Sequence, residues 1–419
     1  MPSLSDKLKS LGVKVGAQNI PAPPARITYS IEHVIPGRFL NTPAGGIYVV
    51  EEVYPPEFTY GDILLRGSAP LHTLLEWAGY GSRTGEEEQG MGLSLLSPSQ
   101  FAYFDIETTG LSGGTGTYAF LVGLGKFVGE DFLLSQFFMR DPIEEPALLL
   151  ALEECLAPID ALVSYNGKAF DVPIVNTRYI TQGWVSPFSS LPNVDLLHLS
   201  RKIWRDRLPS KTLGNIETFI LGARRTEEDI PGWMIPQLYF DYLQTGDARP
   251  LKNVFYHNAM DILALAALFN YLSSFLSDPF ILATQDVLDM FGVGRLYEDL
   301  GYIEQACQIY RHCLANGMPE PQLWDAVQRL SFLRKRRGDY DTAIVLWRQA
   351  AEGKHIYAHV ELAKYYEHQL LDYNEAAQWT LSAIEIIRDP VMPLSVRQAW
   401  AEELEHRLRR LERLMSRGG

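Results

Sequence analysis

Two acidic residues, Asp105 and Glu107, stand one residue apart at the end of an apolar run, 101–104. If this run is a β-strand, both side chains point to the same face, because alternate residues of a strand share a face. Two carboxylates so close repel each other unless a cation lies between them. Oxygen ligands of this kind suit hard divalent ions such as Mg²⁺ or Mn²⁺. Gly110 then ends the strand, which predicts that the pair lies near an open edge.

Asp171, His257 and Asp261, which lie much further along the chain, extend this acidic pattern. Asp171 follows Asn166 by five residues, across the end of a predicted strand and the start of a predicted helix. His257 and Asp261 are four residues apart and therefore share one face of a helix. With Asp105 and Glu107, these segments supply four carboxylates, which need two divalent cations to be tolerated in one site. Two such ions ~4 Å apart can stabilise the attacking and the leaving oxygen of a phosphoryl displacement.

Some neighbouring residues have a structural interpretation that the spacing leaves open. Asn166 either caps the helix that follows it or lies beside a substrate, and Asp195 either caps the helix beginning at Leu196 or contacts the site. The glycine-rich stretch 110–116 lacks the Gly-Lys-Ser/Thr ending of a phosphate-binding loop. We therefore exclude a nucleotide-triphosphate site there and expect a flexible connection between strands.

The length and composition describe an ordinary soluble protein. A chain of 419 residues predicts two or three domains, and 47% hydrophobic with 21% charged residues is typical of globular proteins. No apolar run approaches the ~20 residues needed to span a bilayer, and the N-terminus lacks a signal-peptide pattern. The scattered cysteines, with no C-x-x-C pair, predict reduced thiols in a cytoplasm and no zinc site.

The formal net charge of −14 argues against bulk electrostatic attraction to nucleic acid. It leaves room for a local basic channel. Basic residues cluster at 334–337 and between 201 and 225. Each cluster is either a solvated helix face or a surface that binds a nucleic-acid backbone. The second cluster lies between the acidic motifs, which favours a channel there. Its members are Arg201, Lys202, Arg205, Arg207, Lys211, Arg224 and Arg225.

The pattern along the chain divides it into three parts. Residues 1–95 form an extension that is partly β, such as 45–50, and no chemistry is assigned to it. Residues 96–280 alternate strand and helix patterns, which indicates an α/β domain with a central mixed sheet. After the strand that carries Asp105, the predicted strands are 118–128, 132–138 and 161–165, and the predicted helices are 146–156, 172–182, 196–204, 213–221 and 254–275.

Residues 288–419 are predicted to be all-helical with an internal repeat. Ala306, Ala343 and Ala376 recur after 37 and 33 residues in aligned segments. A small residue where two helices cross resembles the tetratricopeptide repeat, and 395–413 is predicted to be a capping helix. Such arrays usually bind partner segments, and a purely structural role is the alternative. The aligned segments are 296–306, 333–343 and 366–376.

The order Asp-x-Glu, then Asn-x-x-x-Phe-Asp, then His and Asp resembles the DEDD exonucleases, the DnaQ-like group of the ribonuclease H-like fold. The resemblance implies that one ion is held by Asp105, Glu107 and Asp261. A second ion is shared through Asp105 and supported by Asp171. The resemblance also implies two divalent cations, Mg²⁺ or Mn²⁺, as cofactors. It places the substrate beside Thr108, Gly110, Asn166 and Phe170.

The general base of these exonucleases is a histidine or a tyrosine before the last aspartate. His257 has three residues between itself and Asp261, which is the spacing of the tyrosine type. Tyr256 has four residues between, which is the spacing of the histidine type. His257 is favoured because a histidine with an ordinary pKa of ~6.5 suits taking a proton from water near neutral pH. Tyr256 stays the alternative.

A closer resemblance runs from about residue 25 to 385. Its segments are similar to the YprB-type bacterial family, which includes the mitomycin repair factor B exonucleases and joins a ribonuclease H-like domain to tetratricopeptide repeats. It implies a cytoplasmic, bacterial 3′→5′ exonuclease in DNA repair. Its substrate is a single-stranded 3′ end, and the repeats bind a protein partner such as a repair helicase, with no membrane involved. The segments that carry the resemblance are 193–199, 213–217, 229–232 and 256–258.

Two alternatives to this function stay open from the sequence. An RNA exonuclease with the same mechanism would use the same residues, because nothing in the chain marks a reader of the 2′-hydroxyl. A non-catalytic adaptor would rely on the repeats of residues 288–419, with a vestigial nuclease-like domain. The complete set of four acids argues against the adaptor.

Overall fold

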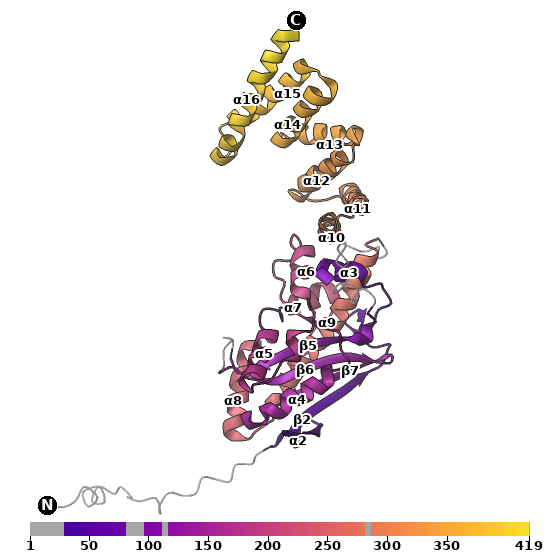
Figure 1. Ribbon diagram of the computed structural model, residues 1–419, viewed down its shortest axis with the longest axis vertical. Helices are drawn as coiled ribbons and strands as arrows, with labels where there is room; N and C mark the ends of the chain where they lie inside the picture. The colour runs from indigo at the N-terminus through magenta and orange to yellow at the C-terminus, as the bar shows by residue number, and fades with distance from the viewer. Residues whose placement is uncertain (1–28, 81–95, 111–115, 281–285, 419) are drawn as a thin grey trace, which may run out of the picture. The chain divides into compact units, whose positions relative to one another are not determined.

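The computed structural model describes residues 29–80, 96–110, 116–280 and 286–418. The chain forms two compact units, one built around a large sheet and one helical (Figure 1). The sheet unit takes the described residues of Met1–Arg66, Leu96–Val194 and Glu217–Leu268. The helical unit takes those of Gly67–Leu95, Asp195–Ile216 and Phe269–Gly419.

The sheet unit is built on a mixed sheet, which confirms the predicted fold class. Neighbouring strands are antiparallel from β1 as far as β5, and β8 runs parallel to β5. A separate antiparallel pair joins β3 (Thr59–Tyr60) to β4 (Ile63–Leu64). The order across the large sheet is β1 (Arg38–Thr42), β2 (Gly45–Tyr54), β7 (Asp131–Phe138), β6 (Ala119–Val128), β5 (Phe101–Thr108), β8 (Ala161–Ser164) and β9 (Asn193–Asp195).

Most predicted strands are present within two residues of their expected ends, because their apolar runs are long and uninterrupted. The contribution of the N-terminal extension is larger than the sequence suggested. The ribbon β1–β2 extends the sheet by pairing with β7, so that residues 38–54 belong to the same sheet as Asp105. The short helix α2 (Ile31–Val34) precedes this ribbon.

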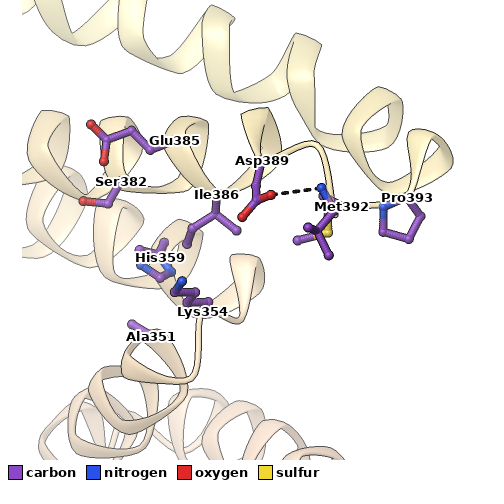
Figure 2. A pocket seen from close by; sticks show the side chains of 10 residues that line it. Ala351, Lys354, His359, Ser382, Glu385, Ile386, Asp389, Met392 and Pro393 are labelled. Atoms are coloured by element: carbon purple, nitrogen blue, oxygen red, sulfur yellow. Dashed lines mark hydrogen bonds between the residues drawn. The ribbon is translucent and has the colours of Figure 1, made fainter.

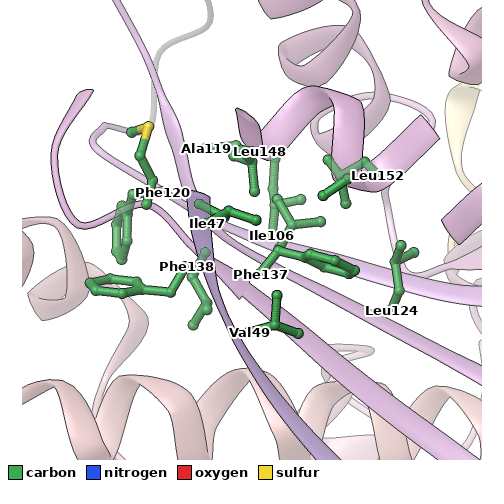
Figure 3. Packing of buried hydrophobic residues seen from close by; sticks show 14 of the residues in the cluster. Ile47, Val49, Ile106, Ala119, Phe120, Leu124, Phe137, Phe138, Leu148 and Leu152 are labelled. Carbon is green, nitrogen blue, oxygen red and sulfur yellow. The ribbon is translucent and has the colours of Figure 1, made fainter. Parts of the chain in front are cut away.

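Side chains alternate between the two faces of the sheet, and each face is covered by helices. On one face Ile106 and Phe137 pack with Leu148 and Leu152 of α4 (Glu145–Leu156) (Figure 3). On the opposite face Phe138 lies 5.3 Å from the ring of Phe255 in α9 (Leu251–Ser277). Because Ile106 faces α4, Asp105 and Glu107 on either side of it face the α9 layer.

Helix α9 is the central helix of this second layer. By length and composition it could cross a membrane, which corrects the expectation that no apolar run is long enough. However, 72% of the residues in its most apolar window are buried within the fold, as in the core helix of a soluble protein. Helix α8 (Ile235–Thr245), which the sequence did not predict, covers the same face, and its Tyr239 ring stacks on Phe120 at 4.0 Å.

The helical unit consists mainly of consecutive antiparallel helices, each packed on the next along the chain. Ala306, Ala343 and Ala376 are fully buried, as a helix-crossing position requires. The helices are α10 (Val287–Leu300), α11 (Ile303–Ala315), α12 (Gln322–Arg336), α13 (Tyr340–Glu352), α14 (Ile356–Tyr365), α15 (Tyr373–Arg388) and α16 (Leu394–Gly418). The shorter helices α3 (His72–Leu75), α6 (Leu196–Ile203) and α7 (Leu213–Ile216) belong to the same unit.

The turn inside each aligned segment contains a residue with left-handed backbone. Gly301 and Gly338 hold this position with φ of 85° and 76°, and Leu371 holds it in the third segment with φ of 56°. A residue with a Cβ atom pays about 1 kcal/mol or more for this conformation. The side chain of Leu371 is 64% exposed, so little packing compensates for the strain.

Replacing Leu371 with glycine is therefore expected to stabilise the protein. The predicted gain in the free energy of unfolding is about 0.5–1 kcal/mol, because strain is removed at the cost of some backbone entropy. Urea denaturation followed by circular dichroism measures it. Leu370→Gly is the matched control: this neighbour is also exposed but has helical backbone, so stability should fall by about 1 kcal/mol. A loss of stability in Leu371→Gly contradicts the prediction.

Candidate metal centre

The end of β5 holds the first two acids of the centre. A β-bulge interrupts the pairing of β5 with β6 between Glu107 and Thr108, just where the strand ends. The Thr108 hydroxyl donates to the carbonyl oxygen of Gly110 at 2.8 Å and closes the turn that follows. Among the described residues, none other than its chain neighbours lies within 4 Å of where a Cβ atom on Gly110 would be. The middle of the glycine-rich stretch, 111–115, lies outside the described residues.

Asp171 is the first residue of α5 (Asp171–Thr181), and its charge acts on both Asp105 and Glu107. Between β8 and this helix the chain turns at Asn166, whose φ of 67° is left-handed. Phe170 occupies the N-cap position, so the interpretation of Asn166 as the helix cap is wrong. The Phe170 ring is 52% exposed beside Asp171.

Helix α9 brings His257 and Asp261 to the same place, on the shared face that their spacing predicts. One nitrogen of His257 and one carboxylate oxygen each of Glu107 and Asp261 lie within 4.8 Å of one another. Asp105 and Asp171 lie outside this group of three ligands, and Asp171 acts on Asp105 and Glu107 through its charge. The centre thus draws on three separate elements, β5, α5 and α9. A set of carboxylate oxygens with one imidazole fits a hard divalent cation such as Mg²⁺ or Mn²⁺.

The gathered carboxylates change one another's pKa. Burial raises the pKa of Asp105 well above its ordinary value, and the charges of Asp261, Glu107 and Asp171 raise it further. The pKa of Glu107 is raised by burial and by the charges of Asp261 and Asp171. In the metal-free protein these two groups therefore resist ionisation, and a cation that favours the charged forms would be bound in exchange for protons.

Comparison with known proteins agrees with this geometry. A family model described as the RNase_H superfamily matches residues 102–273, the segment from β5 to α9. Over 284 residues the chain is 31% identical to the uncharacterized protein YprB of Bacillus subtilis, and the alignment covers 66% of this chain and 67% of that protein. The chain belongs to the YprB family. Residues 102–273 thus form a nuclease-like domain of the ribonuclease H superfamily.

In this YprB-family protein Asn258, which is fully buried, holds Asp105 in place. Its Nδ2 donates to Asp105 Oδ2 at 2.9 Å, and its Oδ1 accepts from Gln136 Nε2 at 3.0 Å. Gln136 also donates to the carbonyl of Phe255 at 2.8 Å. Gly123 leaves the space for Asn258, since a Cβ atom there would lie 2.4 Å from Asn258 Oδ1. Sequence reasoning missed this network, and the glycine inside an apolar strand was the available signal.

His257 is oriented by Asp229, which sequence reasoning also missed as a site residue. The Nδ1 atom of His257 lies 2.7 Å from Asp229 Oδ1, and its Nε2 lies on the other side, 3.7 Å from Asp261 Oδ2. Tyr256 is engaged elsewhere, because its hydroxyl accepts from the backbone N–H of Thr226 at 3.0 Å. The geometry thus favours His257 over Tyr256 as a group that can reach a water beside the acids.

Members of both predicted basic clusters serve other purposes. Several of them form ion pairs within the helical unit, so they act in packing that unit. Arg225 differs, because it forms an ion pair with Asp261 of the acid cluster. Asp195 accepts from the N–H of Leu197 at 3.1 Å, which confirms that it caps α6. Among these pairs in the helical unit are Lys202–Asp299, Arg205–Asp206, Arg207–Asp289, Arg334–Glu304, Lys335–Glu361 and Arg337–Glu304.

The helical unit contains a cavity of about 410 Å³ among its last helices (Figure 2). Apolar residues Ile386 and Met392 line it together with charged Lys354, Glu385 and Asp389. Figure 2 shows the Asp389 carboxylate accepting a hydrogen bond in the turn before α16, where the Val391 N–H donates to Asp389 Oδ1 at 2.9 Å.

The raised pKa of Asp105 leads to a prediction about metal-free protein. A folded-state pKa above the unfolded value gives stability that is present at low pH and is lost as the pH rises through the folded-state pKa. Asp105→Asn removes the repelled charge, so its melting temperature in EDTA should exceed that of the wild type. The gain should grow with pH, to about 2–6 °C at pH 8.

Thermal melting in EDTA and in Mn²⁺ between pH 5 and 8 tests this expectation. The wild type should be stabilised by Mn²⁺, and Asp105→Asn should lose most of that effect. Asp131→Asn, which changes an exposed acid at the start of β7, should behave like the wild type. If Asp105→Asn is less stable than the wild type in EDTA at pH 8, the carboxylates do not repel each other as described.

Proposed function

We propose that this protein is a metal-dependent nuclease of the DEDD type, a 3′→5′ exonuclease that acts on DNA in repair. The observation that carries the proposal is the convergence of Asp105, Glu107, Asp171 and Asp261 beside His257. Raised pKa values at two of these acids support a site built for cations. Perturbed pKa values cluster at functional sites, which supports a functional role for these carboxylates.

Each residue has a role in this proposal. Two divalent cations, Mg²⁺ or Mn²⁺, would supply charge neutralisation for the attacking and leaving oxygens. Asp105, Glu107 and Asp261 would hold one of them, and Asp171 with Asp105 would hold the other. Asn258 fixes the carboxylate of Asp105 by its hydrogen bond and so limits where the first cation can lie.

His257 would act as the general base. With Nδ1–H donating a hydrogen bond to Asp229 Oδ1, Nε2 would keep its lone pair on the side of the acids. Nε2 can then take the proton of the attacking water. The Asp229 carboxylate would also stabilise the imidazolium that forms. The histidine would return to its neutral state when Nε2 passes this proton to solvent.

The substrate would be a single-stranded 3′ end. The exposed ring of Phe170 lies next to Asp171, where it can stack on a nucleobase beside the scissile bond. Asn166 in its left-handed turn and the backbone from Thr108 to Gly110 would line the same entrance. Stacking and backbone contacts bind without regard to sequence, as an exonuclease requires. The DNA substrate, the polarity and the repair pathway rest on the resemblance to the mitomycin repair factor B exonucleases.

The helical unit would act in recruitment. We propose that residues 288–419 are tetratricopeptide repeats that bind a protein partner, such as a repair helicase, in a bacterial cytoplasm. The cavity lined by Ile386, Met392 and Asp389 also favours a second function, that of an adaptor. An RNA exonuclease with the same centre is the third candidate.

A nuclease assay with strands labelled at the 3′ or the 5′ end is the direct test. With Mn²⁺, the protein should release mononucleotides from the 3′ end of single-stranded DNA, and Asp105→Ala should abolish the release. RNA of the same sequence distinguishes the polymers. Absence of cleavage in either metal, or cleavage that is unchanged in Asp105→Ala, rules out the nuclease and leaves the adaptor.

The identity of the general base is tested by replacing each of the two candidate residues separately. His257→Gln should lower kcat by about 10²–10⁴-fold, because the proton acceptor is lost while the acids stay in place. Tyr256→Phe should leave kcat nearly unchanged, since the Tyr256 hydroxyl bonds to the backbone of Thr226. Single-turnover rates over pH 5–9 measure both. The reverse pattern, with Tyr256→Phe inactive, would identify the tyrosine as the base.

A further inference from the structure

Arg225 is a buried cation in direct contact with the acid cluster. Its side chain is 12% exposed and forms an ion pair with Asp261. Its Nη1 atom lies 3.5 Å from Asp229 Oδ1 and 3.3 Å from Nδ1 of His257. The guanidinium group cannot lose its proton in a protein, so this positive charge is permanent. The guanidinium therefore neutralises part of the negative charge of the four acids, and it fills space beside Asp261 that a metal cation would otherwise reach.

A second buried carboxylate anchors Arg225. Glu217, whose side chain is 2% exposed, accepts from the Nε and Nη2 atoms at 2.9 and 2.8 Å. Glu217 in turn accepts from the Tyr60 hydroxyl at 2.6 Å. The turn after Tyr60 is tied to the same segment, because the Asp62 N–H donates to the carbonyl of Leu221 at 2.8 Å. The N-terminal extension thus helps to hold the cation in position.

The N–H groups of Arg225 are largely taken by these partners. A guanidinium offers five N–H groups. Glu217 and Asp261 engage those on Nε and Nη2, and Asp229 and His257 lie near those on Nη1. Little capacity is left for a phosphate of the substrate. The arrangement therefore favours an effect on the charge of the centre over direct binding of nucleic acid.

We propose that Arg225 is a built-in counter-ion that competes with divalent cations for Asp261 and so sets the metal affinity of the centre. The proposal rests on the proposed function for the place where the cations bind. Before a cation arrives, the guanidinium offsets part of the repulsion among the acids. A divalent cation at Asp261 then meets a fixed positive charge on the same carboxylate, and their repulsion is strong because burial weakens screening by solvent and salt.

Arg225→Gln tests the proposal by removing the charge and keeping a donor for Glu217. Calorimetric titration of the metal-free full-length chain with Mn²⁺, without nucleic acid, should show at least about tenfold tighter binding than in the wild type. In EDTA the melting temperature should fall, because the acids lose their counter-ion. Arg224→Gln is the matched control, since it removes the same formal charge from an exposed neighbour and should leave the affinity unchanged.

Arg225→Lys is a second test variant, used in case Arg225→Gln does not fold. Its ammonium group can pair with buried Glu217 but is too short and too compact to bond both Glu217 and Asp261. This variant should therefore fold and also bind Mn²⁺ more tightly than the wild type. Unchanged or weaker binding in both Arg225 variants overturns the proposal, and so does an equal gain in Arg224→Gln. A wild-type chain that binds no Mn²⁺ overturns the proposed function as well, so the two failures are distinguishable.

Discussion

Repulsion among carboxylates at one end of β5 is the constraint on which the rest of the centre depends. Asp105, Glu107, Asp171 and Asp261 come from elements far apart in sequence, and folding brings them together against their mutual repulsion. Under the proposed function, such a site gives up stability in exchange for affinity for cations. The surrounding structure limits this loss with neutral and cationic partners. Asn258 donates to one carboxylate, and Arg225 pairs with another.

The sheet and α9 fix the positions of the polar side chains that contact the acids. The side chain of Asn258 fits between α9 and β6 because Gly123 has no Cβ atom, and Gln136 then fixes the orientation of the amide. His257 is set one helical turn from Asp261 and is turned toward it by Asp229. Each polar group near the acids is thus held by a second group that is itself partly or fully buried. This is the kind of support that a preorganised site requires.

The sequence could predict that two side chains lie together only where they are close neighbours within one strand or one helix. The i, i+2 pair Asp105 and Glu107 and the i, i+4 pair His257 and Asp261 follow directly from the geometry of strands and helices. Alternating strand and helix patterns likewise predicted the fold class. Arg225 could not be singled out in this way, because it is one of several basic residues in a cluster and its partners Glu217 and Asp261 are set by tertiary structure. The spacing left two interpretations of Asn166 open, and the N-cap position of α5 is held by Phe170, which has no capping oxygen.

The pairing of β2 with β7 has a practical consequence for anyone who wishes to work with the nuclease-like domain alone. The matched family region begins at residue 102, and a fragment cut near that point would lose β1 and β2. The backbone N–H and C=O groups of β7 between Phe132 and Phe138 would then form an exposed, mostly apolar edge. Unprotected edges of this kind recruit strands from other chains and lead to aggregation. A soluble fragment therefore has to start before Arg38, even though its chemistry starts at Asp105.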